Sequence, residues 1–515
     1  MVNMAATGVA GWLGRLVCGG GWVEQRLVMS VMLLLAVLNI YTMRTCLSVA
    51  IVQMAEAHKP NATVMDPDRC YAPVAVGAAS SSSPGSHQRP PDFHWDEKVQ
   101  ALVLSSFYYG YIVSHIPGGV LADRFGGKHT LGLGILSTAL TTLLTPPAAY
   151  LGPGYLIALR IIMGLGEGVT FPAVSVLLAH WVPPKERSRL GSFVFAGAQL
   201  GTMAGTGVSG LLLAHFDWPV TFYFFGSLGV VWYALWSLLC FSTPEEHPFI
   251  SDRERHYLHS QIKANNHGKP IAPTPWFAIL TSVPVWGLAV AQVGHDWGLF
   301  GMVTELPKYM KSVLQFSIAE NGLLSALPYF VMWIFSMVFA AIADWIIACK
   351  YWSVITVRKF FTTLASILPA LGIIGASYAG CDATLTVALF TAGMGGMGAF
   401  YPGMRVNGLD LSKHYAGTVM ALVNGLGAVS GMLSPLIVGF LAPNSTLREW
   451  RTTFWVTFGV LVLSNVVFVF TAQARVQDWD RQPDDGDGDD AGAAVNADSG
   501  ERGGASGKQP GIAMT

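Results

Sequence analysis

Charged residues are scarce in this 515-residue chain. Only 12% of its residues are Asp, Glu, Lys or Arg and 52% are hydrophobic, whereas soluble proteins carry about 25% charged residues. Apolar runs of roughly 18 residues or more, which are long enough to cross a bilayer as a helix, recur along the sequence. The shortage of charge therefore excludes an ordinary soluble domain and predicts a protein embedded in the lipid bilayer.

Other absences exclude further classes of function. The net charge is −1 and no cluster of basic and aromatic residues occurs, so we expect no nucleic-acid partner. The six cysteines are scattered, without a CxxC pair or a Cys/His cluster, and predict no metal site and no cofactor. No Ser/His/Asp arrangement or phosphate-binding loop points to an enzyme. The first apolar run begins near Leu27 and is too long for a cleavable signal peptide.

We predict an all-α membrane protein with twelve transmembrane helices in two pseudo-symmetric six-helix halves. The expected spans lie near 27–54, 100–121, 129–149, 155–181, 189–213, 219–241, 279–304, 320–345, 359–379, 383–407, 415–442 and 451–473. The expected units are a cytoplasmic N-terminal segment (1–26), an N-terminal half (27–241) with an outside loop (55–99), a cytoplasmic central loop (242–278), a C-terminal half (279–473) and an acidic tail (474–515). The tail's composition predicts disorder.

The distribution of Lys and Arg predicts the orientation of the chain. With both termini in the cytoplasm, the inside segments hold 15 of these residues and the outside loops hold 8, as the positive-inside rule requires. The sequons at Asn61 and Asn444 then both fall outside, where glycosylation occurs. Asn61 is the better candidate because Asn444 lies close to the membrane.

The two halves of the sequence echo each other. GGVLADRFGGK (118–128) follows the second span, and AAIADWIIACK (340–350) follows the eighth. Two six-helix repeats joined by a cytoplasmic loop are typical of transporters whose halves rock around a central site.

Charges inside the spans mark a candidate site. In RIIMGLGEGVTFPA (160–173), Arg160 and Glu167 are seven residues apart, which places them on one helix face and roughly 10 Å apart along the axis. They are too distant for a direct ion pair, yet both can face one cavity. A charge at membrane depth costs from about 3 to over 10 kcal/mol and needs water or a partner. The alternative for each residue is a structural ion pair to another helix.

Several motifs carry a family resemblance. GVLADRFGGK (119–128) resembles the loop signature of the major facilitator superfamily. That resemblance implies a conformational latch formed by Asp123, Arg124 and Lys128, with Asp344 in the second half. Longer motifs resemble the anion–cation symporter family, which contains sialin, vesicular glutamate carriers and type I sodium-phosphate cotransporters: WDEKVQALVLSSFYYGYIVSHIPGG (95–119), RIIMGLGEGVTFPA, HWVPPKERSRLGSFVFAGAQLGT (180–202), ENGLLSALPY (320–329) and VNGLDLSKHYAG (406–417). The segment 294–329 most resembles the invertebrate phosphate-cotransporter and sialin-like branch.

The resemblance, together with the chemistry of the side chains, implies roles for four residues within the spans. Arg44 and Arg160 form a clamp for an anion, because a guanidinium is a planar fork that stays charged, and Glu167 carries the coupling proton. Arg44 could instead snorkel to an interface. His295 stands where glutamate carriers have an arginine, and with an ordinary pKa near 6.5 it could respond to a pH gradient. It could equally form a packed pair with Asp296.

Other positions leave the substrate open. Met163 and Ser175 replace a second acid and a histidine that the resemblance leads us to expect. Arg405 adds either a third cation for the anion or an anchor at the interface. Cys70 and Cys381 fall in outside loops where sialin has cysteines, which implies a disulfide in an oxidising compartment.

The sequence therefore predicts a monomeric secondary active transporter that carries a small anion with H⁺ or Na⁺ by alternating access. The expected substrate is of the sialic acid, acidic amino acid or phosphate class, and the expected location is the plasma membrane or a lysosomal or vesicular membrane. The rival hypotheses are a sodium-dependent inorganic phosphate cotransporter and a transporter-like receptor that does not transport.

Overall fold

The structure, a computed structural model, describes residues 24–55, 92–248, 250–265, 274–314, 316–412 and 415–480. These residues form helices, and an isolated bridge joins Ala55 to Phe93. The predicted positions Asn61 and Cys70 lie outside the described residues.

The N-terminal half contains one helix or one broken helix for each of its six expected spans. The elements are α2 (Gln25–Met54), α3 (Glu97–Phe125), α4 (Gly127–Leu143), α5 (Thr145–Leu151), α6 (Pro153–Gly168), α7 (Thr170–Trp181), α8 (Pro184–Phe195), α9 (Gly197–His215) and α10 (Trp218–Leu239). The α4 and α5 axes differ by 48°, because Pro146 and Pro147 follow the break and cannot donate to the preceding turn. The fourth span breaks at Val169, three residues before Pro172.

The C-terminal half repeats this plan. Its long helices are α13 (Val283–Ser312), α14 (Ile318–Ala348), α15 (Val354–Tyr378), α16 (Ala383–Met397), α18 (Ala416–Leu441) and α19 (Leu447–Thr471). The span that begins with α16 continues through η2 (Gly398–Phe400), a π-helical turn η3 (Tyr401–Arg405) and α17 (Val406–Leu411). Gly403 is non-helical within η3, with φ −80° and ψ −110°. A π-helical turn of this kind is common at functional positions.

Eight helices among the described residues are long and apolar enough to cross a membrane, or nine if the bent α4–α5 pair is one span. The other expected spans coincide with α3, α8–α9 and α13. The fold therefore agrees with the expected layout of twelve spans. The exposed faces of these helices carry large apolar side chains, such as Leu133, Leu371 and Leu463, as contact with lipid requires.

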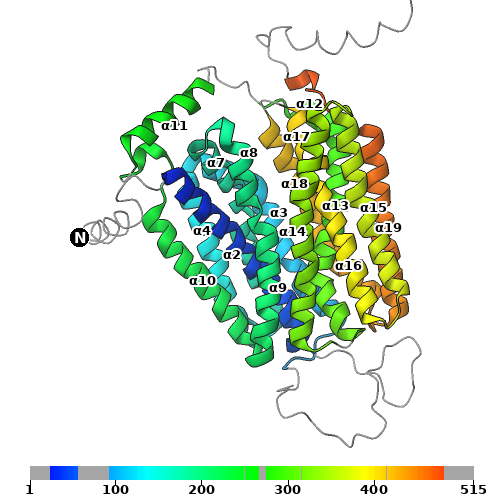
Figure 1. Ribbon diagram of the computed structural model, residues 1–515. Coiled ribbons are helices and arrows are strands. Elements are labelled where there is room, and N and C mark those ends of the chain that lie inside the picture. Colours follow the sequence, from blue (N-terminus) through cyan, green and yellow to red (C-terminus); the bar gives the residue numbers. More distant parts are fainter. Residues whose placement is uncertain are drawn as a thin grey trace, which may run out of the picture.

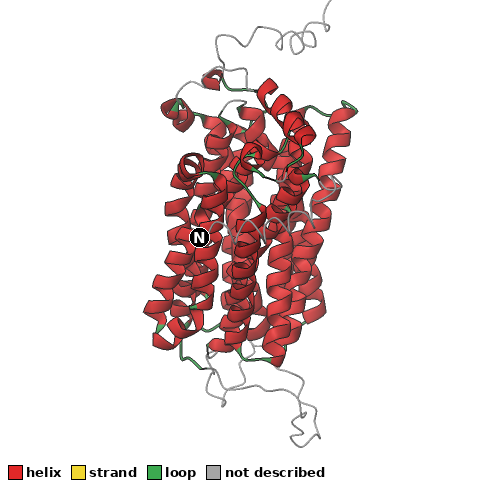
Figure 2. Cartoon of the chain, turned by 90° about the vertical axis from the view of Figure 1, so that its left-hand side faces the viewer, coloured by secondary structure: helices red, strands yellow, loops and turns green. Residues whose placement is uncertain are grey.

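The two halves lie side by side, with α2–α10 on the left and α13–α19 on the right of Figure 1, and their helices run along a common axis in Figure 2. They meet where α2 packs on α13, α3 on α18 and α9 on α14. We call the end of the bundle where α2 ends and α3 begins the outer end, following the predicted orientation. A Cβ atom on Gly210 would lie 2.5 Å from the Gly322 Cα atom there, and Gly439 packs against Ala101. The two halves therefore touch backbone to backbone at the outer end.

Helix starts at the outer end are fixed by side-chain caps. The Asp96 carboxylate accepts from the Val99 N–H at 2.9 Å and begins α3. Capping boxes of Ser317 with Glu320 and of Thr446 with Glu449 begin α14 and α19. These residues satisfy N–H groups that a helix leaves unpaired at its first turn.

Two segments outside the expected spans contain helix. The central loop contains η1 (Pro244–Glu246), α11 (Asp252–Asn265) and α12 (Trp276–Thr281), and Glu254 of α11 accepts from the backbone N–H groups of Gln25 and Arg26 at 2.9 and 3.1 Å. Lys308, one of the eight residues assigned above to outside loops, lies in α13 and is only 5% exposed. The helix continues through Pro307, so the expected span 279–304 ends too early.

Part of the expected tail is packed rather than free. After α19, the Gln473 carbonyl accepts from the Asn407 side-chain amide at 2.8 Å, and the Gln477 N–H donates to the Leu411 carbonyl at 3.0 Å. Asp480, in η4 (Asp478–Asp480), accepts from the Ser412 hydroxyl at 2.7 Å. Residues 474–480 are thus held against α17, and the rest of the tail lies outside the described residues.

Candidate functional site

A buried ion pair joins the first and fourth spans. Arg44 Nη1 on α2 lies 3.5 Å from Glu167 Oε1 on α6, and the two side chains are 5% and 0% exposed. Arg44 therefore does not snorkel to an interface. A pair of this kind is costly to bury, so its position between helices needs strong support from the surrounding residues.

Aromatic rings enclose Arg44. Its Cζ atom lies 4.6 Å from the Phe107 ring centroid, 4.8 Å from that of Tyr108 and 4.9 Å from that of Phe300. The rings of Tyr111 and Tyr41 are slightly farther away, at 5.2 and 5.5 Å. These distances are within cation–π range. Phe300 belongs to α13, so both halves of the protein contribute to the enclosure of this guanidinium.

Arg160 lies nearby but is not ion-paired with Glu167. It is 4% exposed, its Nη1 atom lies 3.3 Å from the Met163 sulfur, and its Cζ atom is 5.2 Å from the Phe107 ring. Phe107 thus contacts both guanidinium groups. This agrees with the seven-residue spacing, which placed Arg160 and Glu167 too far apart for a direct pair.

Three polar atoms of this cluster have no hydrogen-bond partner among the described residues. They are Arg44 Nη2, Arg160 Nε and Glu167 Oε2, and all are buried. Buried polar groups are nearly always hydrogen-bonded. Two donors and one acceptor around the Phe107 ring are therefore unpaired. A polar ligand that binds here could pair with them.

Glycines allow α6 to pack closely against α3. A Cβ atom on Gly164 would collide with the Phe107 carbonyl on α3, and one on Gly168 would collide with the Ser114 side chain. The two helices therefore pack backbone against backbone, as small residues in membrane helices allow. This close approach holds Arg160 and Glu167 beside the aromatic residues of α3.

A cavity of about 70 Å³ lies beside Arg44, between the two halves. Its walls are formed by Tyr41, Arg44, Thr45, Ala198, Gln199 and Thr202 of the N-terminal half and by Leu299, Phe300, Val303, Tyr329, Met332 and Tyr401 of the C-terminal half. Gln199 also hydrogen-bonds Tyr401 across the interface. Arg44 is the charged residue of this wall, whereas Arg160 and Glu167 lie behind it.

Among the described contacts, neither His295 nor Arg405 touches Arg44. The His295 ring stacks on Phe400 with centroids 3.8 Å apart, and Asp296 accepts from Gln292 at 2.9 Å. No hydrogen bond joins His295 to Asp296 among the described contacts, so the packed-pair alternative fails in that form. Arg405 is half-buried after the π-helical turn, and its Nη1 atom donates to Asn424 at 2.6 Å.

The residues of the expected latch make few contacts. Arg124 and Asp344 are exposed, and the side chain of Asp123 lies outside the described part of the structure. Lys128 Nζ donates to the Ser237 carbonyl at 3.1 Å and lies 4.1 Å from the Phe241 ring. The described latch contacts therefore stay within the N-terminal half, so a latch role stays a prediction.

Two expected modifications are only partly described. Cys381 is disulfide-bonded, but its predicted partner Cys70 lies outside the described residues. The Asn444 side-chain amide is exposed and donates to Glu449 at 2.8 Å. Among the described residues, no group of three or more His, Cys, Asp or Glu side chains could hold a metal ion.

The aromatic enclosure was not singled out in the sequence analysis. Tyr108 and Phe300 lie in apolar runs where aromatic residues are common, and only the fold, which places their ring centroids 5.2 Å apart, shows that they enclose Arg44 together. The run SSFYYGY (105–111) was the available signal, since four aromatic rings within five residues cannot all face lipid on one helix.

A helical bundle of two similar halves with charged groups buried where the halves meet defines a membrane transporter of the alternating-access type. Residues 33–435 match the family model described as Major Facilitator Superfamily. The chain belongs to that family.

Relatives and solved structures agree with this assignment. Human sialin is 38% identical over 85% of this chain and 88% of its own length. A Drosophila melanogaster relative named for inorganic phosphate cotransport is 37% identical over 89% of this chain and 87% of its own. The inward-facing, unoccupied crystal structure of a bacterial homologue of the lysosomal transporter Spinster has a TM-score of 0.64 at 13% identity, covering 89% of this chain and 99% of that one. At that identity the likeness concerns the fold alone.

Proposed function

We propose that the protein is a secondary active transporter that carries a small anion together with a coupling cation. The observation that carries this proposal is the buried Arg44–Glu167 pair at a cavity between the halves, with Arg160 close behind it. The names of the relatives support the same substrate class, since they include sialin and a protein named for phosphate cotransport.

The geometry supports a mechanism of competition. Arg44 is held by Glu167 on one side and faces the cavity on the other. An arriving carboxylate or phosphate competes with Glu167 for the guanidinium, which has one unpartnered nitrogen and can bind two oxygens at once. Like-charge repulsion then favours a neutral Glu167, so anion binding and proton uptake occur together.

Rocking of the two halves completes the cycle. Their backbones touch at the outer end, and Arg44 is enclosed by rings from both halves. Breaking those contacts would expose Arg44 to the outer side. The cavity of about 70 Å³ has room for several waters, and a bulkier anion requires the rings to move.

Glu167→Gln tests this function. Glutamine mimics the protonated carboxylate, so the purified variant in proteoliposomes should still exchange labelled for unlabelled anion. It should lose the acceleration that an inward proton gradient gives to the wild type. Phosphate, sialic acid, glutamate and urate are the substrates to screen, each with proton and sodium gradients imposed separately.

Three outcomes would count against the proposal. A full proton-gradient response in Glu167→Gln would remove that residue from coupling and point to His295. Loss of exchange together with loss of expression would favour a purely structural pair. Binding of an anion by the wild type without any exchange would favour the transporter-like receptor.

The sodium-dependent phosphate cotransporter is the rival that one observation favours, namely the name of the Drosophila relative. It predicts phosphate uptake that depends on sodium rather than on pH.

We propose that both termini face the cytoplasm and that the location is the plasma membrane or a lysosomal or vesicular membrane. We also propose that one chain is the functional unit, because one chain supplies every group of the site.

A further inference from the structure

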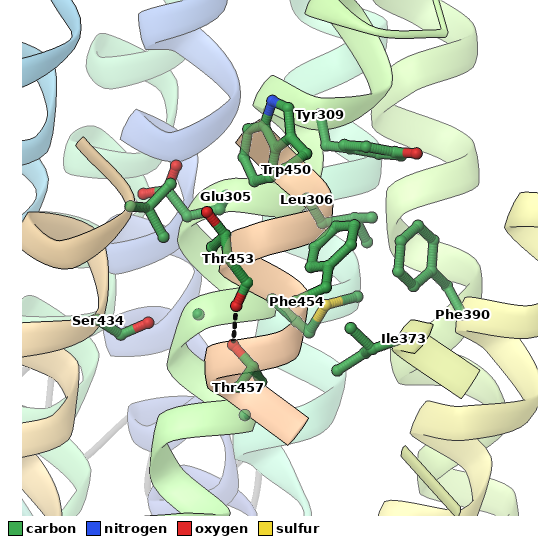
Figure 3. Close-up of a pocket in the computed structure, with 14 residues that line it drawn as sticks. Glu305, Leu306, Tyr309, Ile373, Phe390, Ser434, Trp450, Thr453, Phe454 and Thr457 are labelled. Atoms are coloured by element: carbon green, nitrogen blue, oxygen red, sulfur yellow. Dashed lines mark hydrogen bonds between the residues drawn. The ribbon is translucent and has the colours of Figure 1, made fainter. Parts of the chain in front are cut away.

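A second, smaller cavity lies inside the C-terminal half, toward the outer end (Figure 3). It has a volume of about 30 Å³ and lies among α13, α15, α16, α18 and α19. Most of its wall is apolar, but five side chains bring oxygen atoms to it: Glu305, Tyr309, Ser434, Thr453 and Thr457.

Glu305 is a buried carboxylate without adequate compensation. It is 4% exposed, and neither of its oxygens has a hydrogen bond of good geometry among the described residues, although the Lys308 and Thr304 side chains lie close enough to act on it. Its contact is an ion pair with Lys308 Nζ at 3.5 Å, but the same Nζ atom lies only 2.6 Å from Glu97 Oε2 on α3. One ammonium therefore serves two carboxylates, and one negative charge is left over in a buried place, where it is costly.

The hydroxyl groups of Thr453 and Thr457 are oriented to accept. Thr453 Oγ1 donates to the Glu449 carbonyl, and Thr457 Oγ1 donates to the Thr453 carbonyl, each at 3.2 Å. The second of these bonds is the dashed line in Figure 3, where Thr453 lies beside Glu305. Because their protons are engaged with the backbone, both oxygens have only lone pairs left for a ligand. The lone pairs of these two threonines and the Glu305 carboxylate suit a cation, whereas the Tyr309 hydroxyl and the Trp450 indole N–H, which also line the cavity and have no partner among the described residues, can donate to a water beside it.

We propose that Glu305, Thr453 and Thr457 form a site for one small monovalent cation, sodium or a proton. The single excess charge matches a monovalent ion, whereas a divalent cation such as Ca²⁺ takes six to eight oxygen ligands. A water needs about 10–15 Å³ of such space, so the cavity of about 30 Å³ holds an ion with a water. Sodium uses the hydroxyl oxygens, while a proton needs only Glu305.

The site has a consequence for the contact between the halves. When a cation neutralises Glu305, Lys308 is free to pair with Glu97 alone, which fastens α13 to α3 at the outer end. Cation binding then stabilises the outward-closed form. This role in coupling rests on the proposed transport function, whereas the existence of the site does not.

The thermal unfolding of the purified full-length protein in detergent tests the site. Replacing choline by sodium at constant ionic strength and pH 7.5 should raise the unfolding midpoint of the wild type by several degrees, because a ligand that binds only the folded state stabilises it. Glu305→Gln should abolish that rise. Thr453→Val should raise the half-maximal sodium concentration about tenfold, the effect of losing one interaction of about 1.4 kcal/mol.

Thr452→Val is the matched control, since Thr452 is the neighbouring threonine on α19 and is exposed. It should leave the sodium response unchanged. Glu167→Gln should also keep the sodium response, because Glu167 lies outside this cavity. If the wild type responds to sodium but transports no anion, the transport proposal is refuted and the cation site is not.

A titration from pH 8 to pH 5.5 without sodium identifies a proton as the occupant. In that case acid raises the midpoint of the wild type relative to that of Glu305→Gln, which shares every other titrating group, and Thr453→Val keeps this difference. The ionisable groups that act on Glu305 are Lys308 on its own helix and Glu97 on α3, and Tyr309 lines the same cavity.

Four results would overturn the site, the last two of them in variants that retain Glu305. The first is a wild type that responds to neither cation, and the second is a Glu305→Gln variant that responds to both as the wild type does. If Glu305→Gln does not fold, Thr453→Val and Lys308→Met decide. An unchanged sodium response in Thr453→Val would then overturn a sodium site, and an unchanged acid response in Lys308→Met, which takes away the other charge next to Glu305, would overturn a proton site.

Discussion

At the scale of single residues, the proposed anion site contains guanidinium groups that are fixed by rings rather than by many hydrogen bonds. Arg44 contacts five aromatic rings and one carboxylate oxygen. Arg160 contacts the Phe107 ring and the Met163 sulfur. Such contacts hold a charge in place without using all its donors, which leaves nitrogen atoms for an anion.

Arg160→Lys should therefore impair transport although it keeps the charge. An ammonium group cannot reproduce the planar fork or its stacking, and we expect at least about a tenfold loss of anion uptake. Arg451→Lys is the control, because Arg451 lies 4.5 Å from the Tyr378 ring and far from Arg44 in the fold. Wild-type uptake by Arg160→Lys would reduce the role of Arg160 to positive potential.

A buried histidine outside the spans predicts a loss of stability in acid. His247 is 3% exposed, lies 4.8 Å from the Phe241 ring, and its pKa is lowered to about 4 because burial disfavours the charged form. The unfolded chain binds the proton near pH 6.5, so folding loses stability as the pH falls from 6.5 toward 4. At pH 5 the loss is about 2 kcal/mol.

Thermal unfolding midpoints at pH 7.5 and pH 5.0 check this. The drop between the two pH values should be smaller in His247→Phe than in the wild type, because phenylalanine does not titrate. His256→Phe, at an exposed position of α11, should leave the drop unchanged. Equal drops in all three proteins would contradict the assignment to His247.

At the scale of helices, the contact of α9 with α14 depends on the absence of side chains. Gly210 and Gly322 face each other so closely that a Cβ atom on Gly210 would lie 2.5 Å from the opposite Cα atom. Backbone atoms cannot move aside as a flexible side chain can. The pair therefore sets the closest approach of the two halves at the outer end.

Gly210→Ala should wedge the outer end apart and slow uptake at least about fivefold, since overpacking a tight contact costs typically 1–3 kcal/mol. Gly207→Ala is the control on the same helix, because its Cβ atom would meet only Ala326 at 3.6 Å. A cysteine at Ala101, which is 1% exposed, should react faster with an impermeant thiol reagent in the Gly210→Ala background. Equal reaction rates in both backgrounds would contradict the wedge.

Helices could be predicted where a long apolar run defines them. They could be predicted less well where contacts in the folded protein determine whether a helix forms. The predicted spans recur because a bilayer demands runs of that length. Helix α11 was missed, since its charged sequence has no apolar run and Glu254 reaches α2 only in the folded protein. Arg44, Arg160 and Glu167 could be found because charges are rare in spans. Their pairing could not, because 123 residues separate Arg44 from Glu167.

At the scale of the whole molecule, the two halves are joined at the outer end by glycine contacts and by the Glu97–Lys308 ion pair at 2.6 Å. The central cavity lies on the inner side of these contacts. The structure thus represents a form closed at the outer end, and the orientation of the chain in the cell decides which compartment that end faces.

Asn61→Gln tests that sidedness. The variant should lose the mass of one glycan on a gel and transport normally, because a glycan on an outer loop does not shape the central cavity. Asn444→Gln should change the mass little, since the Asn444 amide is engaged with Glu449 beside the bundle. An unchanged mass in Asn61→Gln calls for protease treatment of sealed cells, and cleavage of the C-terminal tail there would mean that the orientation is inverted.

The segment after α19 is tied to α17 at three points, through Asn407, Leu411 and Ser412. Helix α17 continues directly from the π-helical turn that carries Arg405. Any swing of α17 that opens the inner side must therefore carry residues 473–480 with it. The position of this segment therefore reports the position of α17. A fluorophore placed on the segment would show each turnover as a change in its distance to the N-terminal half, without any label near the transported ion.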